Sequence, residues 1–144
     1  MNKEKRKDAS EERPPANAWL MGTAGWLFPG AGHLFQGHWV RASLLGGAIW
    51  VCFVIGLMMG GQFFKYSGGE QGFSTLLQIP PMIANLGTGL LYVVCWMLGF
   101  GFSDDPLQAA RATYEYGNTF LLIAGLLNYL AMLDAFDISG GRKS

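Results

Sequence analysis

Charged residues are scarce in this chain, and their scarcity argues against an ordinary water-soluble domain. Lys, Arg, Asp and Glu make up 14% of the 144 residues, whereas soluble domains carry about 25%. Half of the ten Lys and Arg residues lie within the first thirteen positions, at Lys3, Lys5, Arg6, Lys7 and Arg13. The rest of the chain therefore contains long stretches almost without charge, which are typical of segments that face lipid.

Cysteine and histidine are also rare, with two of each, and this limits the chemistry that the chain predicts. Cys52 and Cys95 lie inside apolar runs, where a thiol behaves as a small hydrophobic group. His33 and His38 have no further metal ligands nearby in sequence, and no spacing predicts zinc or haem. No pattern is typical of a nucleophilic triad or a nucleophile elbow. We expect no catalytic residue, no cofactor and no metal.

The chain has no net charge, so no overall field attracts nucleic acid, and we expect no nucleic-acid partner. Four apolar stretches occupy most of its length, at residues 16–35, 42–64, 81–102 and 117–138. A helix of about 20 residues crosses the hydrocarbon core of a bilayer. The predicted fold class is therefore all-α, an integral membrane bundle of four transmembrane helices in one domain, 16–138. Residues 1–15 are predicted to be a disordered cytoplasmic tail, and 139–144 a second cytoplasmic tail.

The first apolar stretch is interrupted by Pro29, Gly30, Gly32, His33 and Gly37. Pro29 removes a backbone donor, so the first helix is predicted to be broken here. Irregular backbone at membrane depth needs polar partners. One interpretation makes His33 a buried ligand or a proton-handling group, because ionisable side chains in membrane spans are often functional. The favoured interpretation is structural, with His33 bonded to a backbone carbonyl that Pro29 leaves free.

Two features are predicted for the second and third stretches. The second carries Ser43-x-x-x-Gly47 and Gly56-x-x-x-Gly60, spacings that let helices approach closely. Pro80-Pro81 is expected to open the third helix, where a missing donor costs least. If the third stretch forms one continuous helix, four of its residues lie on one face: Asn85, Gly89, Tyr92 and Trp96. This polar and aromatic stripe is predicted to face neighbouring helices.

The last stretch holds the remaining candidate functional or packing residues. Asn118 and Asn128 lie on or near one face. Glu115 is interpreted as a solvated interfacial acid between two tyrosines, or else as a group that binds a cation or an arginine. Asp134 and Asp137 are neighbours at a spacing of three residues. They are candidates for an acid/base pair, an ion site or an anchor for an arginine, with a structural or interfacial role favoured.

The distribution of Lys and Arg predicts the orientation. With four spans and a cytoplasmic N-terminus, the inner segments hold the five N-terminal charges together with Lys65, Arg142 and Lys143. The outer segments hold Arg41 and Arg111. Eight charges against two is a positive-inside bias, so both termini are expected in the cytoplasm.

Two resemblances add to this interpretation. The first resemblance lies in the segment Pro29-Gly30-Ala31-Gly32-His33-Leu34-Phe35-Gln36-Gly37. It resembles the signature of the two-transmembrane domain family. In that family the signature ends the first of two paired helices. Phe35-Gln36 stands where an aromatic pair usually follows in that family. Over the whole length, residues 28–33, 114–117, 126–128 and 133–137 are similar to an uncharacterised family of bacterial multi-pass membrane proteins. That resemblance implies a protein of the bacterial cytoplasmic membrane and implies no activity.

The function predicted from these observations is a non-enzymatic scaffold or interaction subunit of the membrane. The protein is expected to lie in the lipid bilayer. Its expected partner is a second copy of the chain or another membrane protein. The alternative is a small transporter or channel, which a water-filled cavity lined by His33, Asn85, Asn128 or Asp134 would support. A second alternative is a membrane enzyme that acts on lipid, although an enzyme is less favoured than a non-enzyme.

Overall fold

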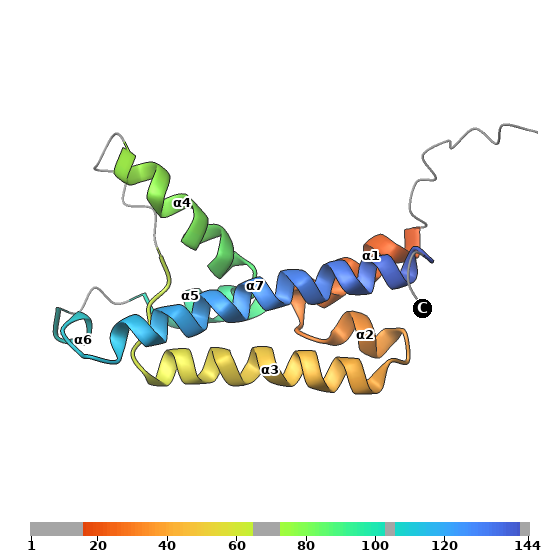
Figure 1. The fold of residues 1–144 in the computed structure, drawn as a ribbon, viewed down its shortest axis with the longest axis horizontal. Coiled ribbons are helices and arrows are strands. Elements are labelled where there is room, and N and C mark those ends of the chain that lie inside the picture. The colour runs from red at the N-terminus through yellow and green to blue at the C-terminus, as the bar shows by residue number, and fades with distance from the viewer. Residues whose placement is uncertain (1–15, 65–72, 103–105, 142–144) are drawn as a thin grey trace, which may run out of the picture.

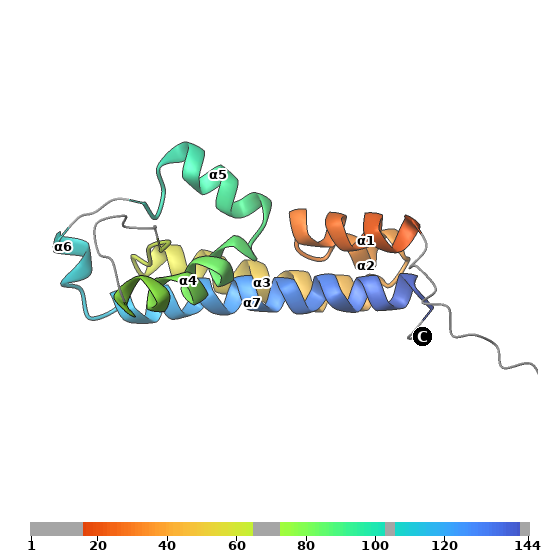
Figure 2. The ribbon, with the colours of Figure 1, turned by 90° about the horizontal axis from the view of Figure 1, so that it is seen from above.

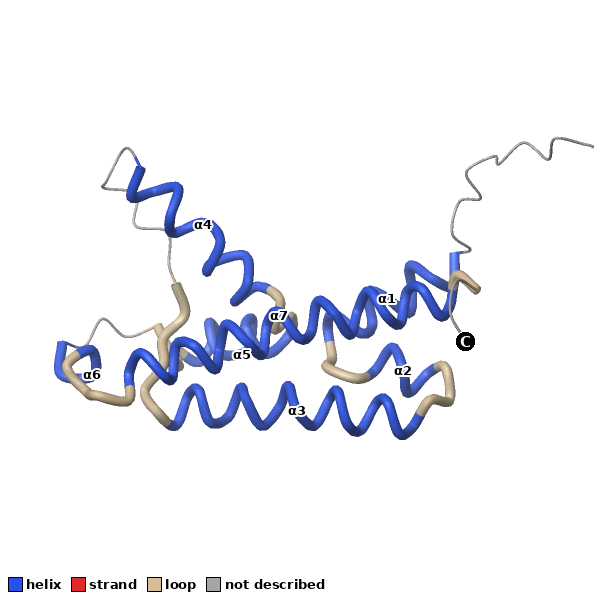
Figure 3. The backbone as a smooth tube through the Cα atoms, in the orientation of Figure 1, coloured by secondary structure: helices blue, strands red, loops and turns tan. Residues whose placement is uncertain are grey.

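The structure, a computed structural model, describes residues 16–64, 73–102 and 106–141, and all regular structure within these ranges is helical (Figures 1 and 3). The helices are α1 (Ala16–Leu27), α2 (Ala31–Phe35), α3 (Trp39–Met58), α4 (Phe73–Leu86), α5 (Leu90–Leu98), α6 (Pro106–Ala109) and α7 (Tyr114–Ser139). The predicted tail 1–15 and the last three residues of the predicted tail 139–144 lie outside the described residues.

The frame of the molecule is the pair α3 and α7, which run side by side in opposite directions (Figures 1 and 2). With 20 and 26 residues, both are long and apolar enough to cross a membrane. The described residues hold two such helices, or three if α4 and α5 are counted as one bent span. Four were predicted from the sequence.

Glycine allows α3 and α7 to pack closely. A methyl group on Gly56 of α3 would come within 3.0 Å of the carbonyl oxygen of Gly117 on α7. The same methyl group would approach the side chain of Leu121, which is fully buried. Ile49 and Phe53 lie in the same buried cluster as Leu121. The core therefore lies along the α3–α7 contact.

The segment predicted as one span at 16–35 consists of α1, a three-residue break and α2. Gly30 occupies the left-handed region at the break, with a φ of +89°. Beyond the break α2 turns back, so that it ends at the end of the bundle where α1 begins (Figure 1). The N-terminus of α1 and the C-terminus of α7 also lie at that end (Figures 1 and 2).

The third predicted span is wrong in its bounds. A helix was expected to open at Pro80-Pro81 and continue to residue 102, but α4 begins at Phe73, contains both prolines and ends at Leu86. The chain then bends by 105° into α5. Gly89, with a φ of +62°, precedes α5. The predicted stripe through Asn85, Gly89, Tyr92 and Trp96 therefore does not exist as one helix face, and Trp96 is exposed.

Aromatic side chains pack between α5 and the segments that follow α3 and α5. The ring of Phe63 stacks on Phe102 at 5.1 Å between centroids, and Tyr92 meets both rings edge-on. A backbone bond from Phe63 N to the Gly101 carbonyl, 2.8 Å long, joins the two connecting segments. The segments that follow α3 and α5 are thereby held together.

Candidate functional site

The candidate polar residues of α7 each reach a different segment of the chain. Asp134 lies near one end of the helix, Asn128 near its middle and Asn118 near its start. Asn118 and Asn128 are buried, and Asp134 is partly buried. α7 therefore presents three polar contacts along its length.

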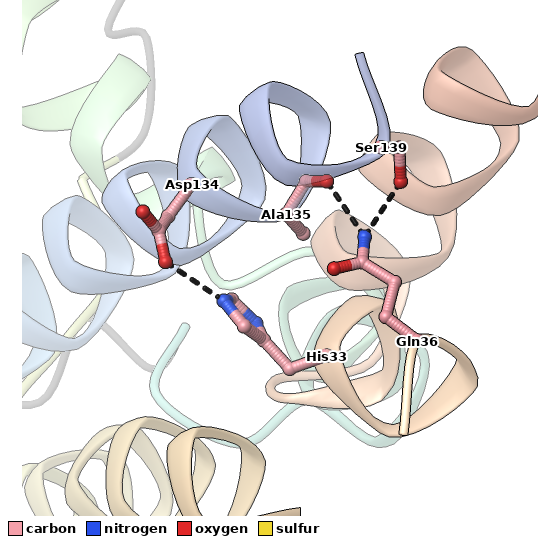
Figure 4. A network of polar contacts seen from close by, with 5 residues as sticks. All are labelled: His33, Gln36, Asp134, Ala135 and Ser139. Carbon is pink, nitrogen blue, oxygen red and sulfur yellow. Dashed lines mark hydrogen bonds and ion pairs between the residues drawn. The ribbon is translucent and has the colours of Figure 1, made fainter. Parts of the chain in front are cut away.

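The first contact fixes α2 against the last turns of α7 (Figure 4). His33 and Asp134 are joined by a 3.0 Å contact between Nε2 and Oδ2. An ionised carboxylate only accepts hydrogen bonds, so with Asp134 ionised the ring is the donor. His33 is 1% exposed and Asp134 27% exposed. Nε2 of His33 thus meets a carboxylate, whereas the sequence interpretation gave His33 a backbone carbonyl as partner. The two residues lie 101 positions apart, which is why sequence reasoning singled out both without pairing them.

Gln36, three residues after His33, supports the same contact. Its Nε2 group donates to the carbonyl of Ala135 and to the hydroxyl oxygen of Ser139, each at 2.7 Å. His33 of α2 and Gln36, which caps the C-terminal end of α2, thus hold a helix of only five residues on α7. Sequence reasoning missed Gln36 and Ser139. The available signal was a polar side chain three positions from His33 in an apolar stretch.

The glycines around His33 serve packing and turning. A methyl group on Gly32 would come within 2.7 Å of the Met21 carbonyl and 2.8 Å of Ala135, so only glycine lets α2 lie between α1 and α7. Pro29 and Gly30 are buried against α3. Gly37 is exposed, with a φ of +78°, and forms the turn into α3.

The second contact lies at the centre of the molecule. The Nδ2 group of Asn128 donates to the carbonyl of Trp26 at 2.9 Å and to the carbonyl of Gly87 at 2.8 Å. Trp26 belongs to the last turn of α1, and Gly87 lies in the break between α4 and α5. Carbonyls at helix ends lack intrahelical donors and need other partners. One amide therefore supplies a donor to both breaks.

The third contact holds the segment after α3. The Oδ1 atom of Asn118 accepts a bond of 2.7 Å from the backbone N–H of Gln62. Nearby, the hydroxyl of Thr113 donates to the carbonyl of Met59 at 3.0 Å. Glu115, one turn before Asn118, is exposed. These contacts fix the start of α7 to the end of α3.

Asn85 is not brought into a polar contact of this kind. Asn85 is fully buried on α4, and neither atom of its amide has a hydrogen-bond partner among the described residues. Asp137 is partly buried one turn after Asp134. A buried amide without partners carries an energetic cost, so Asn85 has unused hydrogen-bonding capacity.

A cavity of about 330 Å³ lies between α1 and α7. Its lining residues are Trp19, Gly22, Thr23, Trp26, Met132, Leu133 and Phe136. None of His33, Asn85, Asn128 and Asp134 lines it. In the described ranges, no three His, Cys, Asp or Glu side chains are arranged to hold a metal. The polar groups instead bind segments of the same chain.

Comparison with known proteins gives one match. Residues 20–144 match a family described as a family of unknown function, DUF6677. The resemblance to an uncharacterised family is thereby confirmed. No curated protein and no solved structure matches the chain.

Proposed function

Because this chain belongs to DUF6677, a family of unknown function, we propose a function from its surfaces: a non-enzymatic membrane protein that associates with a second copy of itself through the outer face of α3. Its proposed location is the bacterial cytoplasmic membrane, with both termini in the cytoplasm. The proposal rests on one observation, the difference between two small-residue pairs of α3.

The two pairs have different surroundings. In the pair Gly56-x-x-x-Gly60, Gly56 is buried against α7. In the pair Ser43-x-x-x-Gly47, both residues are exposed, and a methyl group on Gly47 would meet no atom within 4 Å. Small residues four apart let a second transmembrane helix approach the backbone closely. Gly47 therefore offers the same kind of surface as Gly56, but faces outward.

An apolar groove extends this surface along α3. Its lining residues are Trp50, Val51, Val54 and Ile55. Helical geometry places Val51 and Val54 within about 80° of Ser43, on the side of Gly47. We define this outer face of α3 as Ser43, Gly47, Val51 and Val54. A face with both small residues and a groove suits a symmetric pair, in which the same patch on each copy meets its equivalent.

The polar contacts support the non-enzymatic part of the proposal. His33, Asn118 and Asn128 are buried and bind other segments of the fold. Each of these bonds joins α7 to an irregular or short segment. Such bonds satisfy the backbone and side-chain groups that lipid leaves without partners. The proposed role of these side chains is therefore to hold the fold.

Cysteine cross-linking in membranes tests the proposal. In full-length protein with Cys52→Ala and Cys95→Ala, Gly47→Cys is oxidised with copper phenanthroline. A covalent dimer is expected on a non-reducing gel. Ala48→Cys is the matched control, because it is exposed on the same helix but turned about 100° away. Equal cross-linking of both variants, or none at Gly47→Cys, would overturn the proposed interface.

The size of the unmodified protein gives a second, independent readout. In nanodiscs at matched protein concentration, the native chain is expected to be dimeric. Gly47→Leu places a large side chain where the backbones would meet, so it is expected to be monomeric. A monomeric native chain would contradict the proposal, whatever the cross-linking result.

A small transporter or channel is the second candidate, favoured by the meeting of two broken segments at Asn128. Broken helices near mid-depth form the substrate sites of many transporters. The test is ion and solute flux in liposomes, for the native chain and for His33→Ala. Flux above that of empty liposomes, reduced by the substitution, would support this candidate. Flux equal to that of empty liposomes would remove it.

A further inference from the structure

The chain has a repeated plan. We propose that it consists of two inverted repeats, α1–α2–α3 and α4–α5–α7, each made of a re-entrant segment and one crossing helix. The two re-entrant segments enter the membrane from opposite faces and meet inside it. The chain therefore crosses the membrane twice, at α3 and α7.

The order of elements is the first support. The first repeat begins with a helix of 12 residues and the second with a helix of 14. A break of three residues follows in each, at 28–30 and 87–89, and then a shorter helix. Each repeat ends with one of the two helices that are long and apolar enough to cross a membrane.

The sequences at the two breaks are also alike. Residues 30–35 read Gly-Ala-Gly-His-Leu-Phe, and residues 87–92 read Gly-Thr-Gly-Leu-Leu-Tyr. Both follow the pattern Gly-x-Gly-x-Leu-aromatic. The left-handed glycine is the first of the pair at Gly30 and the second at Gly89. The two segments therefore share a residue pattern and a helix break. They differ in which glycine of the pattern has the positive φ.

Each break rests on a glycine of the long helix in its own repeat. A methyl group on Gly46 of α3 would come within 3.0 Å of the Pro29 carbonyl. A methyl group on Gly125 of α7 would overlap the Ala84 carbonyl, at the end of α4. The same structural solution, a backbone carbonyl against a glycine of the crossing helix, occurs in both repeats.

The two repeats point in opposite directions. α1 begins and α2 ends at the end of the bundle that holds the C-terminus of α7, whereas α4 begins and α5 ends toward the other end (Figures 1 and 2). Their breaks meet, because a methyl group on Gly89 would overlap the Trp26 carbonyl. Asn128 bonds to both breaks at the same place.

Length shows why α1 does not cross. Twelve residues of helix span about 18 Å at 1.5 Å per residue, and a bilayer core is about 30 Å thick. α1 therefore reaches mid-depth, and α2 returns toward the face from which α1 entered. The connection at Gln36–His38 then lies on the same side as both termini. The four-span prediction places that connection on the opposite side.

Charge is compatible with both arrangements. With two crossings, the side of the termini holds the five N-terminal charges, Arg41, Arg142 and Lys143, and the other side holds Lys65 and Arg111. The count is eight against two, the same as for four spans. The positive-inside rule therefore does not distinguish the arrangements, and only a measurement of sidedness does.

Single-cysteine labelling measures sidedness directly. In the full-length chain with Cys52→Ala and Cys95→Ala, a membrane-impermeant maleimide is added to right-side-out and to inverted vesicles. Asn2→Cys and Ser144→Cys report the side of the termini. Trp39→Cys and Phe35→Cys report the α2–α3 connection, and Ala112→Cys reports the segment before α7.

The expected result is that Trp39→Cys, Phe35→Cys and both terminal cysteines are labelled from one face, and Ala112→Cys from the other. Labelling of Trp39→Cys from the same face as Ala112→Cys would overturn the re-entrant first segment. Labelling of Ala112→Cys from the face of Asn2→Cys would overturn the re-entrant second segment. If neither Trp39→Cys nor Phe35→Cys is labelled from the face that labels the two terminal cysteines, that result also counts against the proposal. None of these outcomes depends on whether the chain dimerises through α3.

Discussion

The two broken segments are built on one plan but held by different interactions. α2 is fixed to α7 by side chains, through the His33–Asp134 and Gln36–Ser139 bonds. The last turns of α4 contact α7. There the Ala84 carbonyl lies against Gly125 of α7, and the hydroxyl of Tyr129 donates to the Ile83 carbonyl at 3.0 Å. The first turns of α4 stand away from the bundle (Figure 1).

This difference shows what each segment depends on. A side-chain bond weakens when one partner is removed, but the backbones keep their positions. A contact between a backbone and a glycine has no such tolerance, because any larger residue displaces a whole segment. Glycines of the first segment also meet backbone, the tightest being Gly32, where a methyl group would lie 2.7 Å from the Met21 carbonyl, but a methyl group on Gly125 would overlap the Ala84 carbonyl. We therefore expect the largest effect where the second segment meets Gly125, and the following four experiments rank the effects.

The largest effect is expected at Gly125. Gly125→Ala places a methyl group on the carbonyl of Ala84, so α4 must shift. The free energy of unfolding is expected to fall by about 3 kcal/mol or more, the upper end of the range for overpacking. Unfolding in mixed detergent micelles measures this change. Gly22→Ala, also inside a helix, is the matched control, since a methyl group there would come no nearer than 3.5 Å to the side chain of Phe136. Equal stability of the two variants would refute the close contact.

Asn128 serves both segments, and its loss is expected to loosen both. Asn128→Leu leaves the carbonyls of Trp26 and Gly87 without their donor, at an expected cost of about 2 kcal/mol. Hydrogen exchange followed by mass spectrometry is expected to speed up around residues 28–31 and 87–91 together. Asn118→Leu, which removes the other buried amide with a backbone partner, should affect only the region of Gln62. Faster exchange at one break alone would contradict the shared role.

The His33–Asp134 bond is expected to matter less and to act only on the first segment. His33→Ala and Asp134→Ala are each expected to cost about 1 kcal/mol, the usual scale for polar bonds between membrane helices. The double variant should cost less than the sum of the two, because each single change leaves one partner without its bond. A double-mutant cycle measures the coupling. Strict additivity would show that the pair contributes nothing.

The smallest effect is expected on the outer face of α4. Leu76 is exposed, so Leu76→Ala should change the free energy of unfolding by less than about 0.5 kcal/mol. Leu121, fully buried against α3, is the matched comparison. Leu121→Ala should cost about 2 to 5 kcal/mol. A large effect at Leu76 would show that α4 packs against something absent from the monomer.

Sequence reasoning approached the two long helices more closely than the short ones. α3 covers 39–58 where 42–64 was predicted, and α7 covers 114–139 where 117–138 was predicted. Length and hydropathy are local properties, and they are enough to place such helices. The second break depends on how closely Gly125 lets α4 approach. That is a tertiary contact. Gly87 and Gly89 weaken a helix locally, but they do not by themselves set the bend of 105°.

The polar contacts show the same limit. His33, Asn128 and Asp134 were singled out because polar side chains in apolar stretches need partners. Their partners were not predictable, because the pairs are separated by 41 to 102 positions. The recurrence of Gly-x-Gly-x-Leu-aromatic was the one signal in the sequence that related the two halves, and it becomes informative once both breaks are seen.

The position of Asn128 and Asp134 in the last helix has a consequence for biosynthesis. A ribosome completes α1, α2, α4 and α5 before it adds either residue. Until then, the Trp26 and Gly87 carbonyls and the His33 ring have none of the bonds described above. The early segments of a nascent chain should therefore remain incompletely folded, and a chain truncated before Asn128 is expected to be degraded by membrane proteases. A pulse-chase comparison of chains ending after Leu126 and after Ser139 would reveal this dependence on the final helix.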